Sequence, residues 1–221
     1  MNILFVSLGC DKNLVDTEVM LGLLAQKGHQ MVDEEELADV IIVNTCCFIH
    51  DAKEESIQTI LEMASYKVEG RLKALIVTGC LAQRYKQEIL DEIEEVDAVL
   101  GTTSYDQIVE VMEEVLQGKK TLQLDDVNAL PLVDTKRLVT TGGHYAYLKI
   151  AEGCDKHCTY CIIPKIRGNF RSVPMEHLLK EAKELVTQGV KELILVAQET
   201  TLYGKDIYGD KTLPTLLKEL C

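Results

Sequence analysis

The first half of this 221-residue chain repeats one pattern, in which a short apolar run is followed by a stretch whose apolar residues have helical spacing. Buried strands that alternate with amphipathic helices are typical of a parallel α/β sheet covered by helices. The four predicted strands are Asn2–Leu8, Val40–Val43, Ala74–Val77 and Ala98–Leu100. The predicted helices that follow them are Asp16–Gln26, a segment through Ile57–Met63, Tyr85–Ile93 and Tyr105–Leu116. We therefore predict an N-terminal α/β domain over residues 1–120.

Three cysteines occupy equivalent places in this repeat. Cys10, Cys46 and Cys80 each come just after the carboxyl end of one of the first three strands. Because those ends share one edge of a parallel sheet, where ligand sites gather, we expect the three thiols to converge. Packing as a small hydrophobe explains one cysteine easily, but not three at equivalent positions. The pattern favours a metal or cluster site, whereas Cys47 is predicted to pack, because adjacent side chains diverge.

A second set of cysteines is contained in one short loop. Cys154, Cys158 and Cys161 are separated by three and then two residues, and soft thiolates at such spacing can wrap one metal centre. Three sulfurs would leave one iron of a four-iron cluster open to a substrate or cofactor. The rival interpretation is structural zinc, with His157 or a distant residue as fourth ligand. The spacing favours the cluster, because no second cysteine pair follows.

Composition limits the partners and the compartment. The net charge is -13, from 23 Lys and Arg against 36 Asp and Glu, and this argues against a large nucleic-acid footprint and favours a basic partner. No apolar run approaches the ~20 residues of a membrane span, and no targeting peptide is expected. Eight cysteines without a secretory signal suit the reducing cytoplasm.

A second unit is predicted after a linker. Residues 121–143 hold Pro131, Gly142 and Gly143 and include one short strand near Thr121–Leu124. Residues 144–221 begin with a strand that runs into the three-cysteine loop. Its predicted elements are the strand Tyr145–Ile150, a helix after Pro174, the strand Leu193–Ala197 and a helix around Pro214. Two strand–helix units cannot close a barrel, so we expect an incomplete domain of a longer protein.

Several motifs resemble one known family, the radical S-adenosylmethionine (SAM) methylthiotransferases. The motifs are Val43-Asn44-Thr45-Cys46, Gly153-Cys154, Cys158-Thr159-Tyr160-Cys161-Ile162-Ile163-Pro164 and Arg167-Gly168. Within the family, the chain most resembles the RimO type. This resemblance rests on Lys12-Asn13 shortly after Cys10 and on Val196-Ala197-Gln198 before Thr200-Thr201. Enzymes of the RimO type modify an aspartate of a small-subunit ribosomal protein. The resemblance covers essentially the whole chain. Two residues depart from the family pattern: Cys47 replaces the usual glycine and Glu199 the usual aspartate.

The resemblance implies two [4Fe-4S] clusters with different tasks. The cluster on Cys154, Cys158 and Cys161 would bind SAM and give a radical that takes hydrogen from an aspartate β-carbon. The cluster on Cys10, Cys46 and Cys80 would hold a sulfur, which a second SAM methylates before its transfer. The family completes a partial (βα) barrel and adds a TRAM domain, both beyond the segments predicted here.

Three further residues are candidates around the cofactor. Tyr160 either packs near the SAM adenine or makes ordinary loop contacts. Gln198, at a strand end, is expected to hydrogen-bond the SAM amino group. Arg167 either pairs with a carboxylate or is a surface arginine.

The resulting hypothesis is a cytoplasmic methylthiotransferase of a small-subunit ribosomal protein, supplied by a separate electron donor. The first alternative is a tRNA adenosine methylthiotransferase, which should show a basic face. The second is a non-catalytic zinc-binding interaction module, which would be colourless. For the first hypothesis, contact with nucleic acid is expected only through the ribosome or a further C-terminal domain.

Overall fold

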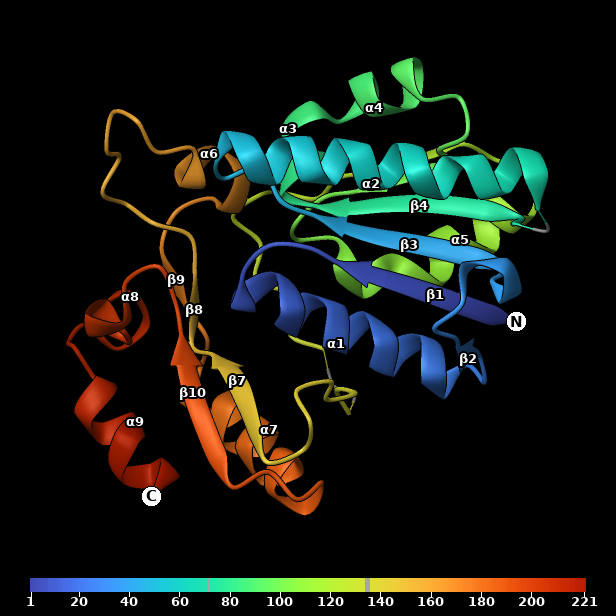
Figure 1. Ribbon diagram of the computed structural model, residues 1–221. Coiled ribbons are helices and arrows are strands. Elements are labelled where there is room, and N and C mark those ends of the chain that lie inside the picture. Colours follow the sequence, from blue (N-terminus) through green and yellow to red (C-terminus); the bar gives the residue numbers. More distant parts are fainter. Residues whose placement is uncertain (71, 134–135) are drawn as a thin grey trace. The chain divides into compact units, whose positions relative to one another are not determined.

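The computed structural model describes residues 1–70, 72–133 and 136–221, and it divides into two compact units, Met1–Arg137 and Leu138–Cys221 (Figure 1). The division falls inside the predicted linker of residues 121–143, of which residues 134–135 lie outside the described part. Both units combine strands and helices, which confirms the α/β class.

The first unit is built on a six-stranded parallel sheet with the strand order β2-β1-β3-β4-β5-β6. Its strands are β1 Asn2–Ser7, β2 Gln30–Met31, β3 Val40–Thr45, β4 Ala74–Gly79, β5 Ala98–Leu100 and β6 Thr121–Gln123. The three strands that precede the cysteines are neighbours and in register, with Val6 beside Val43 and Val43 beside Val77. All four predicted strands are present, and β2 adds an edge strand that was not predicted.

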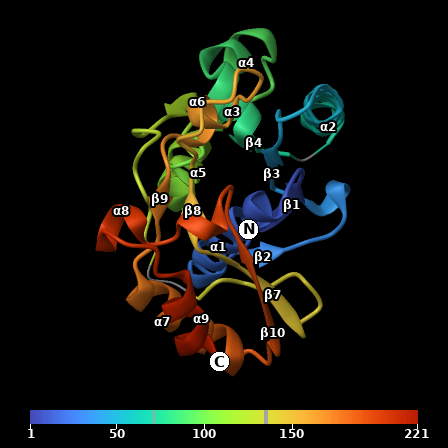
Figure 2. The same ribbon diagram turned by 90° about the vertical axis from the view of Figure 1, so that its left-hand side faces the viewer.

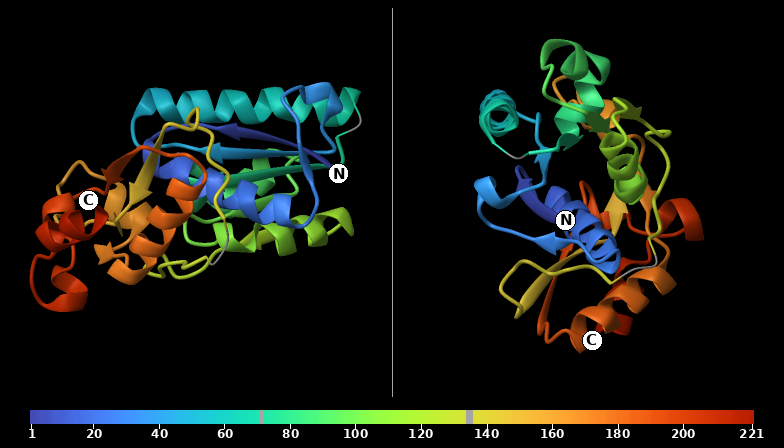
Figure 3. Two further views of the ribbon diagram at one scale, coloured as in Figure 1. Left: turned by 90° about the horizontal axis from the view of Figure 1, so that it is seen from below. Right: turned by 90° about the vertical axis from the view of Figure 1, so that its right-hand side faces the viewer.

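Helices cover both faces of this sheet, with α1 and α5 on one face and α2, α3 and α4 on the other (Figures 1 and 3). The bounds are α1 Asp11–Gln26, η1 Glu35–Leu37, α2 His50–Glu69, α3 Cys80–Tyr85, α4 Gln87–Glu92, η2 Tyr105–Gln107 and α5 Ile108–Leu116. Strand residues alternate between the faces. Leu24 of α1, Ile42, Ile76 and Met112 of α5 belong to one fully buried core, which keeps the strand ends in fixed register.

The single helix predicted over Tyr85–Ile93 is wrong. The structure has two short helices here, because Lys86 adopts a left-handed backbone conformation with φ of 48° that ends α3. The first helix also begins earlier than predicted, at Asp11, since Cys10 is its N-cap residue. Cys10 and Cys80 therefore both lie at helix starts, Cys80 directly after β4 and Cys10 three residues after β1.

The second unit contains two small sheets. β7 (Tyr145–Lys149) pairs in parallel with β10 (Glu192–Val196), and β8 (Ala151–Glu152) pairs antiparallel with β9 (Arg171–Ser172). Its helices are α6 Ile163–Arg167, α7 Met175–Thr187, η3 Thr200–Leu202, α8 Lys205–Tyr208 and α9 Leu213–Leu220 (Figure 2). The predicted strand–helix–strand unit is present as β7, α7 and β10, whereas β8, β9, α6 and α8 were not predicted.

The core of this unit joins its strands to its helices. Leu148 of β7, Leu178 of α7, Tyr203 and Leu216 of α9 are fully buried in one cluster. Within the described part of the chain, no helix has both the length and the apolar character needed to cross a membrane.

Candidate metal centres

The first cysteine triple lies at the carboxyl edge of the six-stranded sheet. Cys46 directly follows β3, Cys80 directly follows β4, and Cys10 lies three residues after the end of β1. Cys46 and Cys80 are buried, whereas Cys10 is exposed. The parallel sheet thus brings together residues that are far apart in sequence, at the edge where α/β folds place their ligands.

Two glycines allow the strand ends to approach each other closely. Gly9 has φ of 96°, and a Cβ there would stand 2.8 Å from the Cys46 Cβ and 3.1 Å from its Sγ. Gly79 has φ of 91°, and a Cβ there would stand 2.3 Å from the Asn44 Oδ1. Only glycine combines this backbone conformation with this space. The segment before Cys10 therefore packs against Cys46 itself.

A buried polar network joins the same strand ends. The Asn13 Nδ2 donates to the carbonyls of Leu8 at 3.0 Å and Thr45 at 2.9 Å. The Cys80 Sγ donates to the Asn13 Oδ1 at 3.7 Å. The Asn44 Nδ2 in turn donates to the Asn13 carbonyl, also at 2.9 Å. These asparagines were not among the predicted site residues, although a polar Asn44 within an otherwise apolar buried strand was a signal of such a network.

Cys47 packs beside the triple. It is buried, and its Sγ donates to the Cys80 carbonyl at 3.2 Å. Burial raises the pKa of the Cys47 thiol, and the nearby Arg84 only partly opposes that shift. A thiol that stays protonated is a poor metal ligand, because the thiolate is the form that binds. This arrangement agrees with the packing role predicted from the sequence.

The second triple lies in the loop that follows β8. The loop begins where the Cys154 N–H donates to the Gly168 carbonyl at 3.0 Å, and the Cys161 N–H donates to the Cys158 carbonyl at 2.9 Å. Gly153 has φ of 71°, and a Cβ there would stand 1.9 Å from the Asn169 carbonyl oxygen. The entrance of the loop is therefore packed backbone against backbone. Cys158 is exposed, and Cys154 and Cys161 are half-buried.

Two side chains inside the loop anchor it to other segments of the second unit. The Asp155 Oδ1 accepts a hydrogen bond from the Phe170 N–H at 2.9 Å. The Lys156 ammonium pairs with the carboxylate of Glu199. Glu199 follows Gln198 in the sequence and lies beyond the end of β10. The hydrogen bond from Lys156, with a second from Thr201, lowers the pKa of Glu199 from 4.5 to about 2, and it raises the pKa of Lys156. Neither anchor was predicted from the sequence.

The side chains of Gln198 and Tyr160 differ in burial. Both polar atoms of the Gln198 side chain are buried and lack a hydrogen-bond partner among the described residues. Such a buried amide is costly unless a further group completes its bonds. The Tyr160 ring, in contrast, is 89% exposed, so it does not make the ordinary loop packing that was one of its two interpretations. Its predicted contact with an adenine remains a prediction.

A buried charged cluster is formed by residues of the elements on either side of the cysteine loop. Arg167 is buried, and its Nη1 lies 3.3 Å from the Glu152 Oε2, while the Lys149 Nζ lies 3.3 Å from the Glu152 Oε1. Of the two interpretations of Arg167, the structure therefore shows the pairing with a carboxylate. The buried charges on β7, β8 and α6 stabilise one another, and losing one partner would leave an uncompensated charge.

One group of metal-ligating side chains outside the cysteines is close together. Among the described residues, the His, Cys, Asp or Glu side chains whose ligand atoms all lie within 4.8 Å of one another are His50, Asp51 and Glu54.

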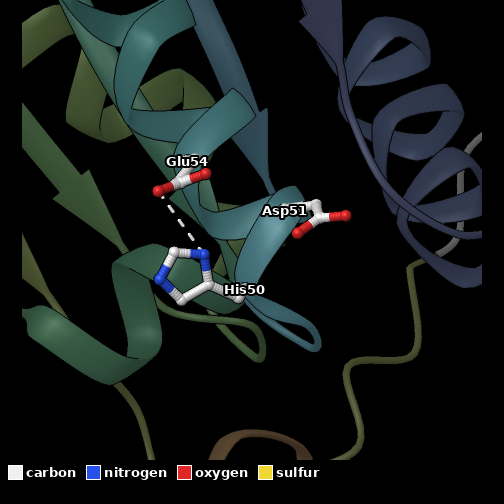
Figure 4. Close-up of side chains that lie close together, drawn as sticks. All are labelled: His50, Asp51 and Glu54. Carbon is white, nitrogen blue, oxygen red and sulfur yellow. Dashed lines mark ion pairs between the residues drawn. The ribbon is translucent and has the colours of Figure 1, made fainter.

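The group at the start of α2 is exposed and has the geometry of an ordinary helix-surface pair. Figure 4 shows the His50 ring and the Glu54 carboxylate turned toward each other, with the His50 Nδ1 3.4 Å from the Glu54 Oε1. Residues four apart on a helix meet in this way without any metal. These residues were not predicted as ligands, and nothing in their surroundings assigns them a metal.

Comparison with known protein families follows the same division of the chain. Residues 2–101 match the family described as "Uncharacterized protein family UPF0004", and residues 148–216 match the "Radical SAM superfamily". The class is thereby defined: a UPF0004 domain is followed by radical SAM sequence. Membership of this superfamily implies a [4Fe-4S] cluster and SAM as cofactors.

Relatives with high identity extend over both domains. The chain is 68% identical over 221 residues to "Ribosomal protein uS12 methylthiotransferase RimO" of Lachnoclostridium phytofermentans. The alignment includes 100% of this chain and 50% of that relative. Proteins of the same name from Thermoanaerobacter sp. and Clostridioides difficile are each 52% identical to this chain. The first alignment includes 99% of this chain and 50% of the relative, and the second includes 97% of this chain and 48% of the relative. The chain therefore resembles these proteins along its whole length, with a UPF0004 domain followed by radical SAM sequence, and it spans about half the length of the curated relatives it matches.

Proposed function

We propose that this chain carries both iron–sulfur sites of a methylthiotransferase that modifies the β-carbon of an aspartate in a small-subunit ribosomal protein. The observation that carries the proposal is the presence of two separate cysteine triples, one in each matched domain. The relatives are named for ribosomal protein uS12, which makes that protein the first substrate to test.

In the second unit, Cys154, Cys158 and Cys161 would hold the cluster that binds SAM. The donor set fits, because three thiolates on one loop leave one iron for an external ligand. The buried amide of Gln198, which has no hydrogen-bond partner in the described part of the chain, supports a polar ligand close to the end of β10. The exposed Tyr160 ring is free to stack on a base. When bound, these cofactors supply a carbon radical, which can attack an unactivated C–H bond.

In the first unit, Cys10, Cys46 and Cys80 would hold a second cluster. Three thiols at neighbouring strand ends are a donor set that a four-iron cluster uses, with one iron left open. Cys47, with its raised pKa, remains a neutral packing residue. The task of this unit is to keep three deprotonated sulfurs at one sheet edge, so that one metal position stays open for a sulfur ligand.

The charge of the chain supports a protein substrate over a nucleic acid. A net charge of -13 attracts a basic protein and repels the phosphate backbone of tRNA. We place the reaction in the cytoplasm, with a separate one-electron donor, because reductive cleavage of a sulfonium consumes an electron.

Mass spectrometry of ribosomal proteins and tRNA from cells that lack the gene tests the proposal. We expect the methylthio mass to disappear from an aspartate of uS12 and to return when the gene is restored. Restoration with the Cys158→Ala gene is the matched control and should fail. A loss confined to tRNA would establish the tRNA alternative, and no loss in either class would contradict both.

A further inference from the structure

Asn13 contacts the surroundings of all three cysteines in the first unit. Its side chain binds the carbonyl of Leu8, two residues before Cys10, and the carbonyl of Thr45, directly before Cys46. The same side chain accepts the hydrogen bond of the Cys80 thiol. One amide group thus touches the ends of three neighbouring strands.

The orientation of this amide follows from its partners. Two backbone carbonyls can only accept, so the NH₂ group of Asn13 must face Leu8 and Thr45, and its oxygen must face the Cys80 thiol. The residue is fully buried. A buried amide whose donors are both used resists rotation, because turning it would set its oxygen against two carbonyl oxygens.

A second layer of polar groups holds Asn13 in place. Its own carbonyl accepts from the Asn44 Nδ2, which also donates to the Thr17 Oγ1 at 2.9 Å. Thr17 in turn shares a hydrogen bond of 2.9 Å with the Ser7 hydroxyl at the end of β1. The packing of Gly9 adds to this restraint, since a Cβ there would stand 3.2 Å from the Asn13 Nδ2.

We propose that Asn13 is the positioning residue that fixes the segments carrying Cys10 and Cys46 relative to each other in the first site. The inference rests on the proposed cluster at that site. Its chemical basis is that groups hydrogen-bonded around metal ligands orient those ligands and hold the metal. Asn13 is suited to this role because its NH₂ group binds the backbone beside Cys10 and Cys46. Its contact with Cys80 belongs to the protonated thiol and ends when that sulfur becomes a ligand.

Asn13→Asp is the test, made in a parent protein with Cys154, Cys158 and Cys161 changed to alanine so that only the first site takes up metal. The aspartate keeps the shape of the side chain but replaces two N–H donors with an oxygen that repels Leu8 and Thr45. After anaerobic reconstitution, the loss of iron to a chelator is followed by absorbance. We expect the variant to lose iron roughly 10–100-fold faster than the parent.

Glu18→Gln is the matched control, because it weakens the buried ion pair that Glu18, on the same helix as Asn13, makes with Arg137, and it leaves the bonds of Asn13 in place. It should lower the thermal midpoint while iron loss stays at the parent rate. Equal rates for Asn13→Asp and the parent would overturn the inference. It would also be overturned if Glu18→Gln lost iron as fast as Asn13→Asp. If Asn13→Asp does not fold, Asn13→Ala, which adds no buried charge, is compared in the same way.

The inference and the proposed function fail in different ways. If the parent takes up no iron, the proposed function is contradicted, and the inference is then tested with Co²⁺, whose thiolate absorption reports the sulfur ligands. A weaker Co²⁺ band in Asn13→Asp than in the parent supports the positioning role, and equal bands overturn it. A parent that binds neither metal contradicts both statements.

Discussion

The two cysteine sites are built in opposite ways. The first is assembled from three strand ends between Cys10 and Cys80 and is largely buried, whereas the second is contained in eight residues between Cys154 and Cys161 and is largely open. The first depends on the register of a whole sheet and on a buried polar network. The second depends on the close backbone packing at Gly153 and on the contacts of the Asp155 and Lys156 side chains. We therefore expect the first site to respond to changes in the fold and the second to respond to changes in its loop.

The largest difference between the two sites is expected in the reaction products that form after a single cysteine of either site is replaced. Cys158→Ala should lower formation of 5′-deoxyadenosine by more than roughly 100-fold, because a lost ligand costs at least as much as the loss of an outer partner. Cys46→Ala should keep that activity but stop methylthio transfer. Both products are measured by chromatography, with Cys221→Ala, an exposed thiol outside both triples, as the control. Absence of 5′-deoxyadenosine in Cys46→Ala with its second site loaded would reverse the roles assigned to the sites.

The next largest effect is expected in the free energy of unfolding when glycines with positive φ are replaced by alanine. The comparison is between glycines in crowded and in open surroundings. Gly9→Ala and Gly153→Ala should each lower the free energy of unfolding by about 3 kcal/mol or more, since left-handed strain and a backbone clash add together. Gly28→Ala and Gly143→Ala, with positive φ but nothing within 4 Å, should cost only about 1 to 2 kcal/mol. Urea unfolding measures all four.

The same four variants sharpen the comparison of the sites. Gly9→Ala should also reduce iron binding by the first site, because the new methyl group would displace Cys46, and Gly153→Ala should affect only the second site. Equal unfolding costs for crowded and open glycines would mean that the close approaches at Gly9 and Gly153 do not hold the sites together.

The smallest effect concerns the exposed anchor of the second loop. The pKa of Glu199 lies at about 2, below its ordinary value of 4.5, so its pairing with Lys156 stabilises the folded state above that ordinary value and is lost as the pH falls toward 2. Lys156→Met should bring the pKa of Glu199 back toward 4.5. A carboxyl NMR titration measures the shift, with Lys165→Met as control. An ordinary pKa for Glu199 in the unchanged protein would show that this pair does not hold the loop.

The strands of the first sheet were predictable because their apolar runs are short, buried on both faces and followed by amphipathic helices. The prediction that the cysteines converge rested on that topology alone. The break at Lys86 was not predictable, since neither glycine nor proline marks it and a lysine rarely adopts a positive φ. The pairing of β8 with β9 was missed for a similar reason, because two residues form each strand and their partners are distant.

The supporting residues of the sites were harder to predict than the cysteines. Cysteine spacing is a local pattern, but the bonds of Asn13 to Leu8, Thr45 and Cys80 exist only once three strands are aligned. Likewise, the sequence left open whether Arg167 pairs with a carboxylate, and only the fold shows Glu152 as its buried partner. Sequence patterns identify groups that bind a metal more readily than the groups that orient them.

The most direct test of the two-site account is the iron content of the anaerobically reconstituted protein. We predict about eight irons per chain in the unchanged protein. Changing Cys154, Cys158 and Cys161 to alanine, or instead Cys10, Cys46 and Cys80, should leave about four. Stoichiometric zinc without iron uptake, or loss of all iron when either triple is changed, would contradict two independent iron–sulfur sites.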